Sequence, residues 1–185
     1  MTISAPGRKA PRVSRFQGMP TKSQAELVVE MLKSQGATVC VAESLTGGLL
    51  AAEFVSVPGA SKVFLGSITA YQNSVKQNLL DVPTNVLESR GAVSAATAEA
   101  MAIGVREQFV HAAGVPLDRV IGISTTGVAG PDADGDQPVG LAYIGLAMPA
   151  HKVTSLRLEM SGDRAQIRAA AVQLAVSELE EQIGN

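Results

Sequence analysis

The stretch VCVAESLTGGLLAA, residues 39–52, contains the transition that decides how this chain folds. Its apolar run stops at Glu43 and Ser44, and small apolar residues resume only after a polar, glycine-rich turn. That turn contains Thr46, Gly47 and Gly48. We interpret the stretch as a buried strand that leads directly into a helix.

The start of such a helix is a potential anion site. Its first N–H groups have no partner within the helix, and the positive end of the helix dipole lies behind them. Because glycine lets a ligand approach the backbone closely, the turn suits a phosphate, or an oxyanion that forms on a carbonyl attacked by Ser44. Serine and threonine are also ordinary N-cap residues, and the segment taken alone favours that simpler interpretation.

Helix and strand patterns alternate along the rest of the chain. A capping-box pattern at Ser23 and Glu26 and a glycine stop at Gly36 predict a first helix. Caps and helical spacing predict further helices over 45–55, from 72 to before 82, over 94–111 and over 163–183. Strands are expected over 38–42, 63–71, 119–124, 139–147 and 153–160. This alternation predicts an α/β fold with helices on both faces of a sheet.

Length and composition fit one domain with an aliphatic core. The 185 residues are 46% apolar but only 3% aromatic, which argues against a wholly disordered chain and against a protein that stacks nucleic-acid bases. Residues 1–22 hold five basic residues and no acid, so the remainder has ten basic against seventeen acidic residues, a net charge of −7. An acidic folded part gives no strong nucleic-acid signal.

The basic segment over residues 1–21 has three prolines and no hydrophobic period, so we expect a disordered tail before a domain over 22–185. Attraction of this tail to nucleic acid or membrane is the less favoured alternative. The single cysteine, Cys40, lies in an apolar run and is expected to be buried. One cysteine and two histidines fit a reducing cytoplasm and predict no metal site. No run of eighteen apolar residues exists, so no membrane span is expected.

A second polar segment holds Tyr71 and Lys76, in a part of the chain that is otherwise poor in charge. A lysine desolvated there would have a lowered pKa and would act as a neutral base towards a serine. Tyr71 would either position this lysine or donate a hydrogen bond. The alternative is an exposed helix lysine whose stem lies on the core, and these residues alone favour it. A dehydrogenase Tyr/Lys pair is rejected because the spacing is five rather than four.

Two further segments have the chemistry of phosphate binding. Hydroxyls and glycines gather over residues 124–130, where we expect a loop that suits phosphate or ribose, with Thr126 and Gly127 in it. The acidic residues after it predict a solvated turn rather than a calcium loop. At the last helix start, Arg164 and Arg168 share one face and are candidates to grip a phosphate. Asp163 as a helix cap with two solvated arginines explains that segment equally well.

Taken together, these segments resemble the CinA C-terminal domain family, the nicotinamide-mononucleotide deamidases. The resemblance covers about residues 22–183. It is carried by AESLTGG, the Tyr71/Lys76 pair, RGAVS at 90–94, TGVAGP at 126–131, QPVG at 137–140 and GDRAQIR at 162–168, in that order. It implies a stand-alone, three-layer α/β/α sandwich with a mixed central sheet in a single domain.

The resemblance also implies an activity, the hydrolysis of nicotinamide mononucleotide to nicotinate mononucleotide and ammonia without a cofactor. Ser44 matches the family nucleophile, Lys76 the base and Tyr71 the site tyrosine, while Thr126 matches the threonine of the TG-AGP loop. Arg164 and Arg168 match the arginines of the GDR segment. On this basis the expected protein is a cytoplasmic amidohydrolase of pyridine nucleotide recycling, with a homodimer as the favoured assembly.

Some alternatives remain open from the sequence. Gln137 stands where the family commonly has a lysine, and the loop over 132–137 is short, so an amidase for another small amide is one alternative. A non-catalytic nucleotide- or partner-binding module, related to competence or DNA damage, is the other. In the enzyme hypothesis, amides of the turn Thr46-Gly47-Gly48 would stabilise the oxyanion.

Overall fold

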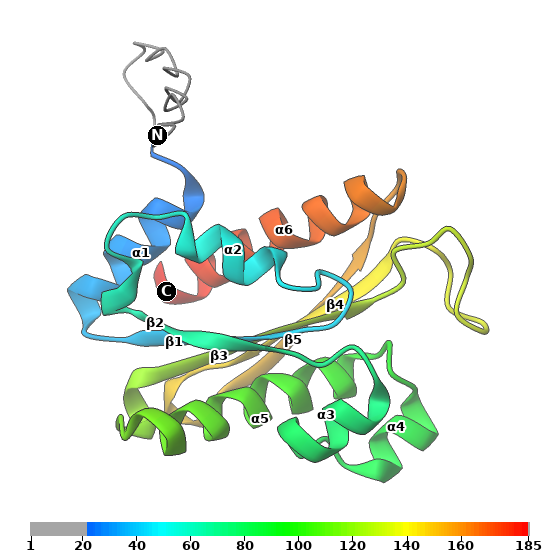
Figure 1. Cartoon of the computed structure of the whole chain (residues 1–185), viewed down its shortest axis with the longest axis horizontal. Helices are drawn as coiled ribbons and strands as arrows, with labels where there is room; N and C mark the ends of the chain where they lie inside the picture. Colours follow the sequence, from blue (N-terminus) through cyan, green and yellow to red (C-terminus); the bar gives the residue numbers. More distant parts are fainter. Residues whose placement is uncertain (1–21, 185) are drawn as a thin grey trace, which may run out of the picture.

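A five-stranded sheet with the order β2-β1-β3-β4-β5 runs through the middle of the computed structural model, which describes residues 22–184 (Figure 1). The strands are β1 (Thr38–Glu43), β2 (Phe64–Thr69), β3 (Val120–Gly127), β4 (Leu141–Ala147) and β5 (Val153–Glu159). β1 pairs in parallel with β2 and β3, whereas β4 is antiparallel to both of its neighbours. The expected mixed sheet is therefore confirmed.

Helices cover both faces of this sheet, which confirms the three-layer α/β/α sandwich (Figure 1). One face carries α1 (Gln24–Gln35), α2 (Leu49–Val55) and α6 (Arg164–Gly184). The other carries α3 (Asn73–Leu80), α4 (Thr84–Arg90) and α5 (Ala95–Ala113). No helix was expected over α4, and α2 begins four residues later than its expected start at Leu45. The expected tail over 1–21 lies outside the described residues.

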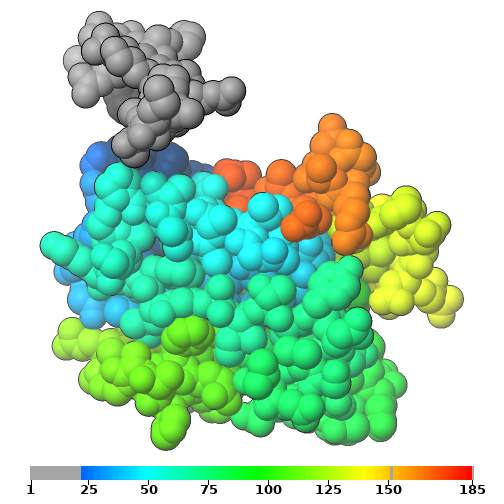
Figure 2. Space-filling view, in the orientation of Figure 1, coloured from blue at the N-terminus to red at the C-terminus, as the bar shows by residue number. Residues whose placement is uncertain are grey.

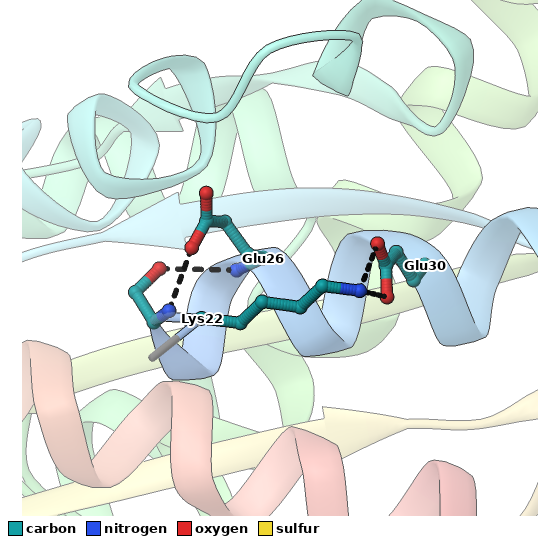
Figure 3. Close-up of polar contacts among 4 residues, drawn as sticks. Lys22, Glu26 and Glu30 are labelled. Carbon is teal, nitrogen blue, oxygen red and sulfur yellow. Dashed lines mark hydrogen bonds and ion pairs between the residues drawn. The ribbon is translucent and has the colours of Figure 1, made fainter. Parts of the chain in front are cut away.

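The start of α1 shows how local sequence sets an element. Ser23 accepts from the Glu26 amide at 3.2 Å and the Glu26 carboxylate accepts from the Ser23 amide at 2.7 Å, so the predicted capping box is confirmed (Figure 3). Lys22 also pairs with Glu30 at 2.7 Å, but both side chains are exposed, and such pairs contribute about 1 kcal/mol at most. Gly36 ends the helix in the left-handed conformation, as expected.

Glycines in the sheet let α5 pack close to β3 and β4. A methyl group on Gly122 would lie 2.1 Å from the Ala102 carbonyl, and one on Gly145 would lie 2.2 Å from the Ala98 carbonyl. Real side chains do not tolerate such distances, so only glycine fits at either position. This close packing fixes the strands whose ends carry the hydroxyl residues described below.

The connections after β1 and β2 go to opposite faces of the sheet. The chain leaves β1 towards α2 on one face, and it leaves β2 towards α3 on the other (Figure 1). Neighbouring parallel strands whose connections diverge in this way leave a crevice outside their carboxyl ends, which is where α/β proteins bind ligands. The fold therefore directs attention to Ser44, directly after β1, and to the residues directly after β2.

Candidate active site

Ser44 is fixed at the carboxyl end of β1. Its amide donates to the Thr125 carbonyl at 2.9 Å, which extends the β1–β3 pairing by one residue beyond the strand. The side chain is 8% exposed, and its Oγ lies 3.2 Å from the Nζ of Lys76. The serine and the lysine, 32 residues apart in the sequence, thus meet in the crevice.

Lys76 comes from the first turn of α3 and is 1% exposed, so the expectation of a solvent-exposed helix lysine is wrong. Its Nζ donates to the carbonyls of Ala70 and Tyr71, at 2.9 and 3.1 Å. Neither of the two ion pairs found within residues 22–184 includes it. Burial without a counter-ion lowers the pKa of Lys76 from 10.5 to about 8.

The three contacts of Lys76 can be made by an ammonium, with three N–H donors, or by an uncharged amine. A neutral amine has two N–H groups and one lone pair, and two carbonyl acceptors lie within hydrogen-bond distance. The third neighbour, the Ser44 hydroxyl, carries a proton that it can donate to the lone pair. Proton transfer from Ser44 to Lys76 is the reaction that this arrangement favours.

A cavity of about 300 Å³ opens beside this pair. Its lining includes most of the expected site residues, namely Ser44, Lys76, Tyr71, Thr126, Gly127 and Arg164. It also includes three polar residues that the sequence analysis did not single out, Gln72, Asn73 and Asp134. Asp134 belongs to the hairpin that projects in yellow beside the orange start of α6 in Figure 2. The volume suits a small-molecule ligand.

The turn after Ser44 differs from the expected anion site. The Glu43 carboxylate accepts from the amides of Gly48, Leu50 and Ala51, at 2.9 to 3.1 Å. The start of α2 is therefore capped by the chain itself, and Gly48 is not available as an oxyanion donor. Ser44 does not cap the helix either, because the N-cap residue is Gly48, which has no side chain, and Glu43 supplies the capping carboxylate.

Three other amides in this turn remain free. Those of Leu45, Thr46 and Gly47 have no hydrogen-bond acceptor within the described part of the chain. Leu45 also lines the cavity, next to Ser44. Of the three expected oxyanion donors, Thr46 and Gly47 therefore remain candidates and Gly48 is replaced by Leu45, although only Leu45 of these residues lines the cavity.

The hydroxyls of residues 124–126 belong to the end of β3 rather than to the expected loop. Ser124 donates to the Ala98 carbonyl at 2.5 Å, and Thr126 donates to the Ala92 carbonyl at 2.7 Å. The hydroxyl of Thr125 pairs with that of Thr46 at 2.7 Å, deep in the protein. These hydroxyls hold the site together, and only Thr126 reaches the cavity.

The two arginines of α6 occupy different environments. Arg164 is exposed at the cavity, where it donates to the Gly130 carbonyl at 2.7 Å and lies 3.4 Å from the Tyr71 hydroxyl. Arg168 does not line the cavity. It donates to the carbonyls of Leu45 and Thr46, at 2.9 and 2.7 Å. Of the two candidate phosphate ligands, the structure brings only Arg164 to the cavity.

Asp163 caps α6, as one of the two interpretations of that segment expected. Its carboxylate accepts from the amides of Ala165 and Gln166, both at 2.9 Å. The cap explains why the helix begins at Arg164, and it orients the first turn so that Arg164 lies beside the cavity. No comparable pattern indicates the capping role of Glu43, which is visible in the sequence only as a charged residue at the end of an apolar run.

Comparison with known proteins gives a consistent family. The model of the CinA C-terminal domain matches residues 21–183. CinA-like proteins of Frankia casuarinae and of a Nostoc species are 47% and 43% identical over 151 and 154 residues. These stretches cover 81% and 83% of this chain, but only 33% and 34% of the relatives. The chain thus spans about a third of the length of the curated relatives that it matches.

Solved structures agree with the sequence matches. A CinA superfamily protein from Klebsiella pneumoniae superposes with a TM-score of 0.78 at 26% identity, covering 87% of this chain and 96% of that one. The competence/damage inducible protein CihA from Agrobacterium tumefaciens gives 0.75 at 28% identity, with 94% and 100% covered. Within residues 22–184, no helix is both long and apolar enough to cross a membrane.

Proposed function

This chain belongs to the CinA C-terminal domain family, and from that membership and the geometry of its cavity we propose that it is an amidase acting on nicotinamide mononucleotide. The reaction would hydrolyse the carboxamide and release nicotinate mononucleotide and ammonia. One observation carries the proposal: a buried lysine amine lies 3.2 Å from a serine hydroxyl at the edge of a cavity.

The first step is acyl transfer to the enzyme. Neutral Lys76 accepts the proton of Ser44 as the serine oxygen attacks the carboxamide carbon. The free amides of Leu45, Thr46 and Gly47 are the candidate donors to the oxyanion. One such donor typically contributes about 3–4 kcal/mol to the stability of the transition state.

The second step returns the enzyme to its starting state. The Lys76 ammonium protonates the departing amine, so ammonia leaves and Ser44 carries the acyl group as an ester. Lys76 is then neutral again and accepts a proton from the water that attacks the ester. It passes this proton to the Ser44 oxygen as the acyl–oxygen bond breaks, which releases nicotinate mononucleotide and restores the serine. Protons balance over the cycle, because each one that Lys76 accepts is passed to a leaving group.

The remaining cavity residues suit the rest of the nucleotide. Arg164 carries a positive charge at the cavity and is the candidate ligand of the 5′-phosphate. Tyr71 and Gln72, from the connection between β2 and α3, and Asn73, the first residue of α3, add a ring and amide groups to the cavity. The tyrosine hydroxyl lies near Arg164, so a bound phosphate would contact both.

The test is ammonia release by the purified protein with nicotinamide mononucleotide as substrate. We expect wild type to release ammonia, and Ser44→Ala and Lys76→Ala to lose turnover while circular dichroism shows an intact fold. Calorimetry with the same nucleotide measures binding separately. Binding without ammonia release would favour a nucleotide-binding module, such as the competence- or damage-related role that relatives' names suggest. If the protein releases ammonia only from other small amides, the Ser44/Lys76 mechanism is kept and the proposed substrate is wrong.

A further inference from the structure

The turn over residues 44–48 is held by two charged side chains that bind opposite kinds of backbone group. The Glu43 carboxylate accepts hydrogen bonds from the amides of Gly48, Leu50 and Ala51. The Arg168 guanidinium donates hydrogen bonds to the carbonyls of Leu45 and Thr46. Between them, the two side chains make five hydrogen bonds to backbone groups of residues 45–51, the segment directly after the candidate nucleophile.

Both side chains are placed where these contacts are strong. Glu43 is fully buried, and its negative charge is stabilised by the three amides and by the positive end of α2. The guanidinium of Arg168 lies so close to the turn that a methyl group on Gly47 would be 3.2 Å from its Nη2. Gly47 also has a φ of +57°, which disfavours any other residue there.

The two carbonyl contacts of Arg168 determine which way two amides point. In a trans peptide unit, the C=O of one residue and the N–H of the next point in opposite directions. With the carbonyls of Leu45 and Thr46 held by Arg168, the N–H groups of Thr46 and Gly47 must therefore point away from it. These are two of the three amides in the turn that have no acceptor within residues 22–184.

We propose that Glu43 and Arg168 are positioning residues for acyl transfer at Ser44. Glu43 and Arg168 fix the turn so that the Ser44 hydroxyl faces Lys76 and the amides of Thr46 and Gly47 are directed to the oxyanion. Arg168 thus acts through the backbone and does not bind substrate. This inference rests on the proposed function for its catalytic part, but the geometry it describes is testable without turnover.

The kinetic test separates a positioning role from a phosphate-binding role. Arg168→Met should lower kcat about 10- to 100-fold and leave KM nearly unchanged, because small displacements of reacting groups have effects of that size. Arg168→Lys should restore part of kcat, since its ammonium can still donate to one carbonyl. Glu43→Gln, which replaces one acceptor oxygen by a donor, should act in the same direction.

The matched control is Arg106→Met. Arg106 also donates to two backbone carbonyls, those of Val120 and Leu117, but at the far end of β3 from the cavity. This variant should lower the melting temperature and leave kcat unchanged. If Arg168→Met keeps a wild-type kcat, or raises KM alone, the positioning proposal is overturned, and the second result would make Arg168 a substrate ligand.

A second measurement does not need turnover. The chain has six lysines, so carbon-13 labelling of lysine Cε and a Lys76→Met spectrum identify the Lys76 signal, whose titration gives its pKa. Wild type should titrate near 8, and Arg168→Met should titrate closer to 10.5, because a loosened turn admits water to the amine. If wild type releases no ammonia, the proposed function fails, and an unchanged Lys76 pKa in Arg168→Met then overturns the positioning proposal on its own.

Discussion

Lys76 and Arg106 are two buried basic side chains near opposite ends of the same sheet, and only one of them is suited to catalysis. They are 1% and 5% exposed, and each donates to two backbone carbonyls. Burial lowers the pKa of both. The pKa of the lysine falls from 10.5 to about 8, whereas the pKa of an arginine is ordinarily so high that Arg106 stays charged at any physiological pH even after it is lowered.

The surroundings complete the difference. Lys76 has a hydroxyl within 3.2 Å and a cavity beside it, while Arg106 is a structural clamp between α5 and the start of β3 and does not line that cavity. Burial of a basic side chain therefore gives a proton acceptor at one end of the sheet. At the other end it gives a charged side chain that joins α5 to the start of β3 by hydrogen bonds. Burial alone therefore does not make a catalytic site. The buried basic group must also be able to lose its proton, and it must lie next to a reacting group, as Lys76 lies next to Ser44.

The largest expected effect comes from exchanging lysine and arginine at positions 76 and 106. Lys76→Arg keeps a cation in place but cannot supply a neutral base, so we expect kcat for ammonia release to fall about 10²–10⁴-fold. The reciprocal variant, Arg106→Lys, should keep kcat within about twofold of wild type, because no reacting group contacts that position. A Lys76→Arg enzyme with wild-type turnover would remove the lysine from the mechanism.

The pH dependence is the next effect in size. Because Lys76 must be neutral to act, kcat/KM should rise through an apparent pKa near 8 and fall about tenfold for each pH unit below it. Steady-state ammonia release across a pH series measures this limb. A profile that is flat between pH values well below and well above 8 would contradict a lysine base, as would an acid limb centred near the ordinary pKa of 10.5.

Folding stability should report the same shift. The folded-state pKa of Lys76 lies below its unfolded value, so the unfolded chain binds the extra proton between pH 8 and 10.5 and stability rises with pH across that window. The full penalty below pH 8, about 3 kcal/mol for a shift of this size, disappears above 10.5. Urea denaturation gives the free energy of unfolding of wild type and of Lys76→Met at each pH. The difference between the two values isolates the contribution of the lysine from that of other titrating groups.

The smallest effect concerns Arg106. Arg106→Met leaves the carbonyls of Leu117 and Val120 without their donor inside the protein, so we expect a loss of about 2 kcal/mol in the free energy of unfolding. Urea denaturation measures it. Since arginine stays charged in both states, the loss should not vary between pH 7 and 10, and a pH-dependent loss would show that the comparison with Lys76 is wrong.

The sequence predicted the helices with clear start and stop signals, and it predicted the sheet. The capping box at Ser23 and the glycine at Gly36 act locally, so their effect is readable without tertiary structure. The limits of α2 were not readable in this way. Its helical pattern extends back to Leu45, but the buried Glu43 carboxylate binds the amides that define the actual start.

The site was harder to predict, because its key property depends on contacts distant in sequence. Residues near Lys76 favoured an exposed side chain, but the side chain is buried. Its amine contacts Ser44, directly after β1, and the carbonyls of Ala70 and Tyr71, directly after β2. Arg168 shows the converse. Its spacing from Arg164 indicated a shared ligand, yet the turn after Ser44 takes its hydrogen bonds, which no pattern within α6 reveals.

The central claim, that Ser44 attacks the carboxamide with Lys76 as its base, is tested most directly by mass spectrometry of protein quenched during turnover. With nicotinamide mononucleotide as substrate, at a pH above the pKa of Lys76, we predict a nicotinate mononucleotide ester on the Ser44 peptide of wild type. We predict no such ester on Ser44→Ala. Ammonia release at the wild-type rate by Ser44→Ala, with no adduct on either protein, would contradict the account.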